Sequence, residues 1–255
     1  MNPFRKDIFG NSVLIKRIMY TAVGLFSFIG LNMRNRMRLQ NSKVLAKLPD
    51  TNVLIISNHQ TYYRDVIAIL HAICSAKWGT FDNLKSPIYL LKPYTRVFYV
   101  AAEETMKESG FIPRLFTLAG AITVKRTWRA KGQEVDREVD TRDVEKIDLA
   151  LRDGWVITFP QGTTKPYADG RKGTALLIKK NRPVVVPVVI NGFRRAFNKK
   201  GLKLKKKGVD LDVRIKEPLE IDYEAPAEQI LQQIMDAIEQ SENYRFQHYR
   251  LRDSK

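Results

Sequence analysis

The stretch SNHQTYYRDV, residues 57–66, places a histidine and an aspartate directly after an apolar run. An imidazole at the end of a buried strand can take a proton from a hydroxyl group when a carboxylate holds its other nitrogen. The nearest acid to His59 is Asp65, six positions further on. The two residues therefore indicate general-base chemistry, and the alternative is a structural histidine that only closes the strand.

Two later stretches carry positive charge and follow apolar runs of their own. Residues 158–167, TFPQGTTKPY, contain a Pro-x-Gly turn, hydroxyl groups and a lysine, which suit an anion. Residues 124–129, VKRTWR, contain Lys125 and Arg126. Because α/β folds present active side chains at the carboxyl ends of strands, we expect a base and two cationic sites to meet there. This layout suits transfer of a group to or from a phosphate-bearing alcohol.

The elements that position these residues alternate between apolar runs and helical patterns. Continuous apolar strands between helices predict one α/β domain with a mostly parallel central sheet covered by helices on both faces. The predicted strands are 52–57, 86–91, 96–101, 120–126, a strand beginning at 155, 183–190, and 210–219 as an edge strand. The predicted helices are 64–76, 143–154 and a C-terminal helix that begins at Pro226.

The composition limits the class of protein. The chain has 255 residues, of which 44% are hydrophobic and 28% are charged, and this is typical of a globular protein. A net charge of +17 favours an anionic partner, whether nucleic acid, an anionic membrane or a phosphorylated substrate. Cys74 is the single cysteine, so no internal disulfide can form and a reducing compartment is expected. Cysteine and histidine show no metal-binding spacing, and we expect no metal.

The N-terminus carries an apolar run of fourteen residues, 18–31. A spanning helix needs about 20 apolar residues, so we expect this segment to lie in the membrane interface with basic flanks on anionic headgroups. A buried core helix is the alternative. The residues expected to contact the membrane are Lys16, Arg17, Phe26, Phe28, Arg34 and Arg36.

A second basic segment, residues 194–207, has eight basic residues and no acid. One interpretation is a solvated loop. The other is a surface that meets anionic lipid, into which Leu202 and Leu204 insert.

Taken in order, four stretches resemble the four motifs of the glycerolipid acyltransferases, the 1-acyl-sn-glycerol-3-phosphate acyltransferase (PlsC-like) family. They are SNHQTYYRD, GAITVKR, FPQGTT and VVVPVVI, and the resemblance runs from about residue 50 to 195. It implies an α/β domain with an N-terminal membrane anchor. It also implies that His59 is the catalytic histidine, that Asp65 orients it, and that Arg126 helps to hold the acceptor's phosphate. The substrate-binding residues implied by the third motif are Gln161, Gly162, Thr163 and Thr164, with Lys165 beside them.

Three positions depart from the family pattern. Five residues separate His59 from Asp65, where the family usually has four. The usual glutamate of the third motif is Gln161, and its usual arginine is Thr164, so that the nearest cation is Lys165. A lysine holds phosphate as a point charge and lacks the bidentate fork of arginine. These changes make a hydroxyacyl aminolipid a competitor to lysophosphatidate as the acceptor.

The expected activity is transfer of a fatty acyl group from acyl-CoA or acyl carrier protein to the hydroxyl of a lysophospholipid. His59 would act as the base, backbone amides near Gly162 would hold the oxyanion, and no cofactor beyond the donor substrate is needed. The expected partner is membrane lipid rather than nucleic acid, at the cytoplasmic face of a membrane (the inner membrane in a bacterium). The alternatives are O-acylation of an ornithine or glycine lipid, or a non-catalytic protein that binds membranes or nucleic acid.

In this interpretation residues 1–40 form a membrane-associating helical segment, residues 41–225 the acyltransferase domain, and residues 226–255 a C-terminal helix packed on that domain.

Overall fold

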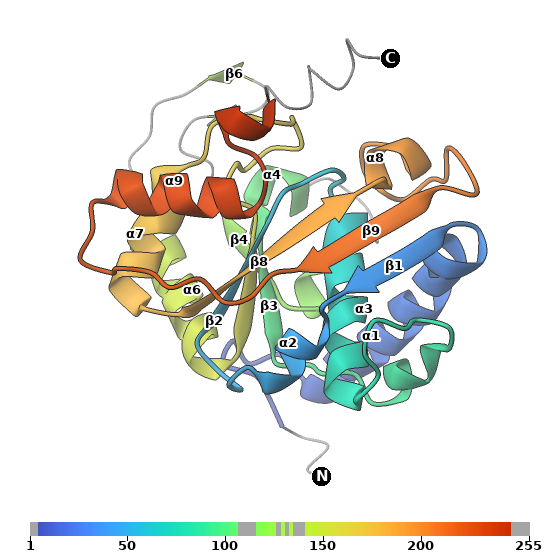
Figure 1. The fold of residues 1–255 in the computed structure, drawn as a ribbon. Helices are drawn as coiled ribbons and strands as arrows, with labels where there is room; N and C mark the ends of the chain where they lie inside the picture. The colour runs from blue at the N-terminus through green and yellow to red at the C-terminus, as the bar shows by residue number, and fades with distance from the viewer. Residues whose placement is uncertain (1–4, 107–115, 126–128, 131–132, 135–140, 246–255) are drawn as a thin grey trace.

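A seven-stranded sheet forms the middle layer of the protein, with helices on both of its faces (Figure 1). The computed structural model describes residues 5–106, 116–125, 129–130, 133–134 and 141–245. The strand order is β1-β9-β8-β2-β7-β3-β4. Strands β8 and β9 pair antiparallel, and the other pairings described for this sheet are parallel. The predicted α/β architecture with a mostly parallel sheet is confirmed.

The strands of the sheet are β1 (Arg36–Gln40), β2 (Val53–Ser57), β3 (Val97–Ala102), β4 (Ala121–Val124), β7 (Trp155–Thr158), β8 (Val184–Asn191) and β9 (Asp210–Ile215); β5 (Arg129–Ala130) and β6 (Gln133–Glu134) form a separate ribbon. The helices are α1 (Val13–Phe28), continued by a π-helical turn (Ile29–Met33), α2 (Lys43–Lys47), α3 (Arg64–Trp78), the 3-10 helix η2 (Pro87–Leu91), α4 (Glu103–Met106), α6 (Thr141–Asp153), α7 (Lys172–Asn181), α8 (Phe193–Ala196) and α9 (Ala227–Ala237).

Strand β2 shows why the sheet is buried on both faces. Its side chains alternate, so that Val53 and Ile55 enter the core beneath α1, α2 and α3. Leu54 and Ile56 enter a second core beneath α6, α7 and α9. All four are fully buried, as a strand in the interior of a parallel sheet requires.

Two strand predictions were wrong. Residues 86–91, predicted as a strand, form the 3-10 helix η2, because Pro87 occupies its first turn and Ile88 and Leu91 share one exposed face at a helical spacing. Strand β9 is not at the edge of the sheet, because β1 pairs along it. Strand β1 itself alternates exposed Arg36 and Arg38 with buried Met37 and Leu39, although residues 1–40 were expected to be helical.

The N-terminal helix is longer than its apolar run. Ser12 caps it by accepting a hydrogen bond from Ile15 N at 3.4 Å, and the helix includes Lys16 and Arg17. Helix α1 and the π-helical turn together span 21 residues, and a window of 18 of them has a mean hydropathy of 1.5. They are long and apolar enough to cross a membrane, a criterion that core helices and signal sequences also meet. The expectation that the segment is too short to cross was therefore wrong.

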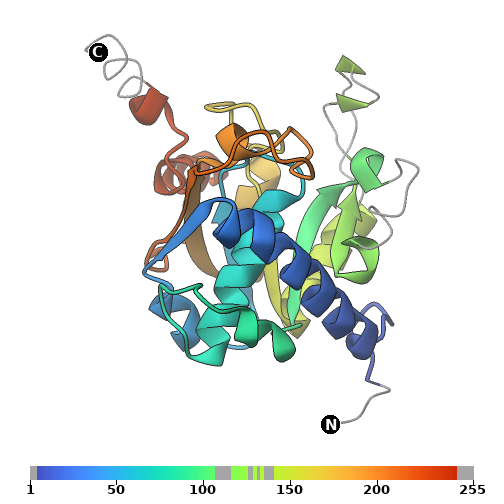
Figure 2. The same ribbon diagram turned by 90° about the vertical axis from the view of Figure 1, so that its right-hand side faces the viewer.

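Helix α1 lies against the domain rather than projecting from it (Figure 2). The Tyr20 hydroxyl donates to Val97 O at 3.2 Å, and Thr21 Oγ1 donates to Leu90 O at 2.7 Å. Ser27 Oγ lies 2.8 Å from Nε2 of His71 in α3. These three hydroxyl groups thus face inward and form hydrogen bonds or close polar contacts with the domain.

The outward face of α1 is apolar, which reverses the usual pattern of a surface helix. The large exposed hydrophobic side chains of α1 and of the π-helical turn recur at a helical spacing and are Leu14, Ile15, Ile18, Leu25, Phe26, Ile29 and Met33. Phe26 is 77% exposed and Met33 is 72% exposed. We call these seven residues the apolar stripe.

Two residues expected to contact the membrane are instead buried. Lys16 is 1% exposed, with its Nζ 4.0 Å from the centre of the Phe98 ring. Phe28 is 8% exposed and packs near the His71 ring. Both lie on the face of α1 that docks on the domain. Phe26, Arg34 and Arg36 are exposed as expected, and Arg17 is half-buried.

The C-terminal helix α9 packs on α7 across the second core. Ile230 and Ile234, with Ile238 at its C-cap, are buried along one face. The helix ends at Ala237, and residues 246–255 of the predicted C-terminal segment lie outside the described residues.

Candidate active site

His59 and Asp65 are in direct contact. The Nδ1 atom of His59 lies 2.9 Å from Oδ2 of Asp65. His59 follows the carboxyl end of β2, and Asp65 lies in the first turn of α3. Asp65 is fully buried, whereas 13% of the His59 side chain is exposed. A carboxylate on Nδ1 holds the proton there and leaves Nε2 as the basic nitrogen.

The five residues between His59 and Asp65 fold around the carboxylate. Asp65 Oδ2 accepts hydrogen bonds from Gln60 N at 2.5 Å and Thr61 N at 2.8 Å. Asp65 Oδ1 accepts a third from Thr61 Oγ1 at 2.7 Å. The loop turns its amides inward, and this absorbs the extra residue while keeping the histidine within hydrogen-bond distance.

The same loop is fixed to the end of β8. Asn58 Nδ2 donates to Ile190 O at 2.9 Å, and Ile190 N donates to Asn58 Oδ1 at 2.8 Å. Gln60 Oε1 accepts from Arg194 N at 3.1 Å. Neighbouring parallel strands β2 and β8 therefore define where the histidine stands.

Phe159 supports the imidazole from one side. Its ring is stacked on His59 with the centroids 4.0 Å apart and the planes 21° from parallel. Phe159 directly follows β7, the other neighbour of β2 in the sheet. The sequence indicated an anion-binding turn here, and it gave no sign that the phenylalanine packs on the histidine.

His59 lines a cavity of about 670 Å³ at the carboxyl ends of β3, β4 and β7. Apolar side chains from β3, β4, α6, α3 and the N-cap of α3 form much of its wall, among them Tyr63, Val66, Val100, Val124 and Ile147. The cations on the wall are Lys125, Arg171, Lys172 and Lys180. Of these, Lys172 pairs with Glu228 at 2.7 Å and Lys180 pairs with Asp148 at 2.5 Å. The cavity offers a large, mostly apolar volume beside a base and cationic groups.

The residues of the third motif do not all reach this cavity. Gly162 lines it, at a φ of 61° that suits glycine. The Gly162 amide donates to Phe159 O at 2.9 Å, so the expectation that it serves an oxyanion is not supported by this arrangement. Gln161, expected to bind substrate, is buried elsewhere: its Nε2 donates to Ala168 O at 2.8 Å and to Gln240 Oε1 at 3.3 Å. Its amide ties the loop to the chain beyond α9.

The next three residues of that loop lie beside the cavity rather than in its wall. Thr163 Oγ1 accepts from Lys165 N at 3.3 Å. Thr164 O accepts a hydrogen bond from the Arg194 guanidinium, and Lys165 is exposed. None of these three residues is among those that line the cavity wall.

Arg126, the expected phosphate ligand, lies outside the described residues. Its neighbour Lys125 is on the cavity wall, and Lys125 N donates to Asp143 Oδ2 at 2.8 Å. Sequence reasoning missed Arg171 and Lys172 at the start of α7. The segment GRKGT that follows the third motif was the available signal, because its glycines and cations mark a turn into a helix.

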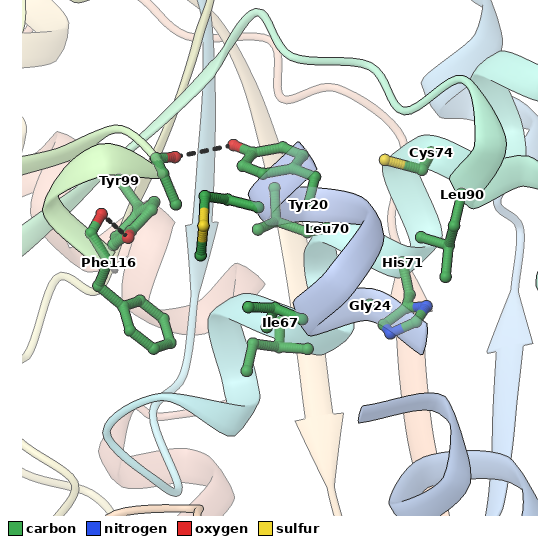
Figure 3. Close-up of a pocket in the computed structure, with 12 residues that line it drawn as sticks. Tyr20, Gly24, Ile67, Leu70, His71, Cys74, Leu90, Tyr99 and Phe116 are labelled. Atoms are coloured by element: carbon green, nitrogen blue, oxygen red, sulfur yellow. Dashed lines mark hydrogen bonds between the residues drawn. The ribbon is translucent and has the colours of Figure 1, made fainter. Parts of the chain in front are cut away.

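A second, small apolar cavity of about 40 Å³ lies between α1 and α3 (Figure 3). Tyr99 and Phe116 line both cavities, and the Tyr99 hydroxyl donates to Phe116 O at 2.5 Å. Gly24 faces Leu90 here, so closely that a Cβ on the glycine would lie 2.7 Å from the leucine side chain. The two cavities are thus separated by a shared wall of two aromatic side chains.

Burial shifts the pKa values of two further residues of the small cavity in the direction that keeps each side chain uncharged. Burial raises the pKa of the Cys74 thiol to about 12, which suppresses the nucleophilic thiolate. Burial lowers the pKa of His71 to about 3, and its Nδ1 lies 2.7 Å from the Tyr89 hydroxyl. Both are consistent with packing roles. Within the described ranges, no group of three or more His, Cys, Asp or Glu side chains could hold a metal ion.

Comparison with known proteins agrees with this fold. Residues 33–191, more than half of the chain, match the sequence model of a family described as acyltransferase. The crystal structure of the 1-acyl-sn-glycerophosphate (LPA) acyltransferase PlsC from Thermotoga maritima has a similar fold, with a TM-score of 0.53. The two chains are 16% identical, over 88% of this chain and 76% of that chain, so the likeness concerns the fold. The comparison with curated proteins found no match.

Proposed function

The chain belongs to the acyltransferase family, and we propose that it moves a fatty acyl group from a thioester donor to the hydroxyl of a lysophospholipid. The observation that carries the proposal is the contact between His59 and Asp65 at the wall of a large, mostly apolar cavity. A base held in one tautomer is what removal of a hydroxyl proton requires. An apolar cavity of this size suits acyl chains.

In this mechanism the acceptor hydroxyl gives its proton to Nε2 of His59 as its oxygen attacks the thioester carbonyl. Asp65 accepts the Nδ1 proton in a hydrogen bond and stabilises the imidazolium that forms. The carbon–sulfur bond of the tetrahedral intermediate then breaks. The imidazolium proton neutralises the departing thiolate, which restores the neutral base. An ester replaces the thioester, and no acyl-enzyme is formed.

We take acyl-CoA or acyl carrier protein as the donor and lysophosphatidate as the first candidate acceptor. Arg171 and Lys125 on the cavity wall are the described cations that support an anionic acceptor. A hydroxyacyl glycine or ornithine lipid is the second candidate, because Thr164 leaves the third motif without the arginine that suits a phosphate monoester.

We also propose that the protein works on a membrane surface, at its cytoplasmic face. Helix α1 is docked on the domain by Tyr20, Thr21 and Ser27 while the apolar stripe faces outward. A helix that is docked on the α/β domain along its length is better placed to lie in the membrane–water interface than to cross the bilayer. The single buried Cys74 and the thioester donors agree with a cytoplasmic location.

The test is an acyl-transfer assay with the purified full-length chain in detergent or vesicles. Labelled acyl-CoA and acyl carrier protein thioesters are each offered with lysophosphatidate, and the acylated product and free thiol are both measured. Formation of the two products in equal amounts supports the proposal. Thiol release without an acylated lipid would show a thioester hydrolase instead.

A further inference from the structure

The basic segment, residues 194–207, presents all of its cations to solvent. Its exposed side chains are Arg194, Arg195, Lys199, Lys200, Lys203, Lys205, Lys206 and Lys207. The segment contains no acidic residue. A concentration of like charge on one surface costs stability through repulsion, so its presence points to an anionic partner.

The fold holds this segment in a defined shape. Phe197 is 2% exposed, and the Arg64 guanidinium lies 4.6 Å from its ring centre. Asn198 Oδ1 accepts from Leu202 N at 3.0 Å, and Gly201 O accepts from Arg64 Nε at 2.9 Å. Leu202 and its neighbour Leu204 pack against the core, so the expectation that they insert into lipid was wrong. The apolar residues anchor the segment and leave the cations outside.

The basic segment adjoins the end of the apolar stripe. A Cβ built on Gly30 would lie 3.7 Å from the Phe197 ring, and Gly208 N donates to Arg34 O at 2.8 Å. Figure 2 shows the end of α1 directly below the loop that carries these lysines. Exposed Met33 of the stripe directly precedes Arg34, and the Arg34 carbonyl is bound by the residue that directly follows the basic segment.

The basic segment also backs the wall of the large cavity. Tyr62 N donates to Lys199 O at 3.0 Å, and Tyr63 N donates to Lys200 O at 3.1 Å. Lys199 Nζ lies 5.7 Å from the centre of the Tyr62 ring, and both tyrosines line the cavity. One edge of the molecule thus joins the apolar stripe, the cationic surface and the His59 cavity.

We propose that the basic segment binds the headgroups of anionic phospholipids when the apolar stripe enters the membrane. The stripe fits the acyl region and the lysines fit the negatively charged headgroup layer next to it. The continuity of the two surfaces favours a membrane over an acidic protein, which would need no apolar stripe. Binding in this orientation brings the cavity wall formed by Tyr62 and Tyr63 to the headgroup layer.

Vesicle sedimentation of the full-length protein tests this proposal. Vesicles of phosphatidylcholine alone are compared with vesicles that also contain phosphatidylglycerol. The test variant is the triple substitution Lys205→Gln/Lys206→Gln/Lys207→Gln. A matched control, Lys43→Gln/Lys47→Gln/Arg152→Gln, removes the same charge near the amino ends of the parallel strands, because α2 and α6 end just before β2 and β7 begin, whereas the basic segment follows the carboxyl end of β8.

The unaltered protein should bind phosphatidylglycerol vesicles more tightly than neutral ones, and added salt should weaken that preference. The test variant should bind them about 100-fold more weakly, since each lysine near an anionic surface contributes roughly fivefold in affinity. The control should keep the preference. Equal losses in the two variants, or no loss in the test variant, would overturn the proposal.

Titration of the same three proteins with purified acyl carrier protein covers the competing partner. If the test variant loses binding to the carrier while it keeps the preference for phosphatidylglycerol, the segment is a protein-docking surface and the proposal is wrong. If it keeps carrier binding and loses the lipid preference, the proposal is supported. These experiments measure binding alone, so their outcome is independent of whether the acyl-transfer assay succeeds.

Discussion

The carboxylate of Asp65 receives Nδ1 of His59 at 2.9 Å while it also accepts hydrogen bonds from Gln60 N, Thr61 N and Thr61 Oγ1. The backbone that separates the two residues is thus wrapped around the group that joins them. A carboxylate that accepts several hydrogen bonds keeps a fixed position, and its contact with Nδ1 therefore fixes the position of the imidazole. This arrangement fixes how each member should respond to substitution.

Replacing the base should nearly abolish activity. The change His59→Ala removes the proton acceptor, and we expect kcat to fall by about 10²–10⁴-fold with little change in the melting temperature, because the side chain is partly exposed. His59→Gln serves as a second variant that retains polarity and bulk without a comparable base. Near-normal turnover in both variants would remove His59 from the mechanism.

Replacing the orienting acid should slow the reaction without removing the base. Asp65→Asn places an amide where the loop donates hydrogen bonds, and kcat should fall by up to about 10⁴-fold, as when an asparagine replaces the aspartate behind another catalytic histidine. The matched variant Thr61→Val removes one donor to the same carboxylate and leaves the Nδ1 contact in place. It should cost stability, about 1–3 kcal/mol, more than activity. Kinetics unchanged by Asp65→Asn would show that another group orients the imidazole.

A single charge on the apolar stripe should weaken membrane association. Phe26→Glu puts a carboxylate on the most exposed residue of the apolar stripe, and we expect much weaker sedimentation with neutral phosphatidylcholine vesicles. Leu149→Glu is the matched control, because Leu149 is an exposed apolar residue of α6 on the other face of the sheet. Equal binding of the two variants would place the membrane contact elsewhere.

The buried amine of Lys16 should make stability depend on alkaline pH. Burial lowers its pKa from 10.5 to about 8, so between these pH values the unfolded chain holds a proton that the folded chain has released. The free energy of unfolding should therefore rise as the pH increases from about 8 to 10.5, by about 3 kcal/mol from this residue.

The measurement is denaturant unfolding of the protein and of Lys16→Met at pH values near 7 and near 9.5. The variant should be more stable near pH 7 and should lack the rise, because methionine fills the site without a charge. The difference between the two proteins isolates Lys16 from the buried tyrosines, which also titrate at high pH. A variant that is less stable near pH 7 would mean that the ammonium group has a favourable partner.

Much of the fold was predictable because its strands are apolar on both faces. The apolar runs 52–57 and 183–190 predict strands in the interior of a covered sheet, and β2 and β8 lie there. Strand β1 was missed because Arg36 and Arg38 looked like the basic flank of a membrane helix. Its partner β9 would have the same alternating pattern with or without a strand paired along its outer side. The order of the sheet could therefore not be predicted from that pattern.

The candidate site was predictable where chemistry and position coincide in one short stretch. His59 and Asp65 lie six residues apart, and the local loop brings them together. Arg171 was missed because its place on the cavity wall depends on the direction of α7 after the third-motif loop, and the sequence does not give that direction. The docked face of α1 was not predictable either. Apolar side chains occur all round that helix, and the polar groups that determine which face docks on the domain, such as His71, lie in another element.

Arg126 lies outside the described residues, so its role remains a prediction. Arg126→Ala should raise the KM for the acceptor more than the KM for the donor, because the resemblance places its cation on the acceptor's phosphate. Separate measurement of the two constants checks this. Equal effects on both substrates would contradict the role.

The acceptor is the part of the reaction where the third motif departs most from its relatives. Gln161 is used to hold the loop, and Lys165 is exposed away from the cavity wall, whereas Arg171 lines the wall. Arg171→Ala should therefore raise the KM for lysophosphatidate by about 10- to 100-fold, the effect of losing a hydrogen bond to a charged group. Lys165→Ala should be silent. Arg182→Ala, at the far end of α7, is the matched control for loss of an exposed arginine.

Each variant is assayed with lysophosphatidate, hydroxyacyl-glycine lipid and hydroxyacyl-ornithine lipid against one donor. We expect lysophosphatidate to be preferred by a narrow margin, because the bidentate arginine of the third motif is absent. A strong preference that survives Arg171→Ala would show that the phosphate is held by other residues and that the loss of that arginine has no effect on selectivity.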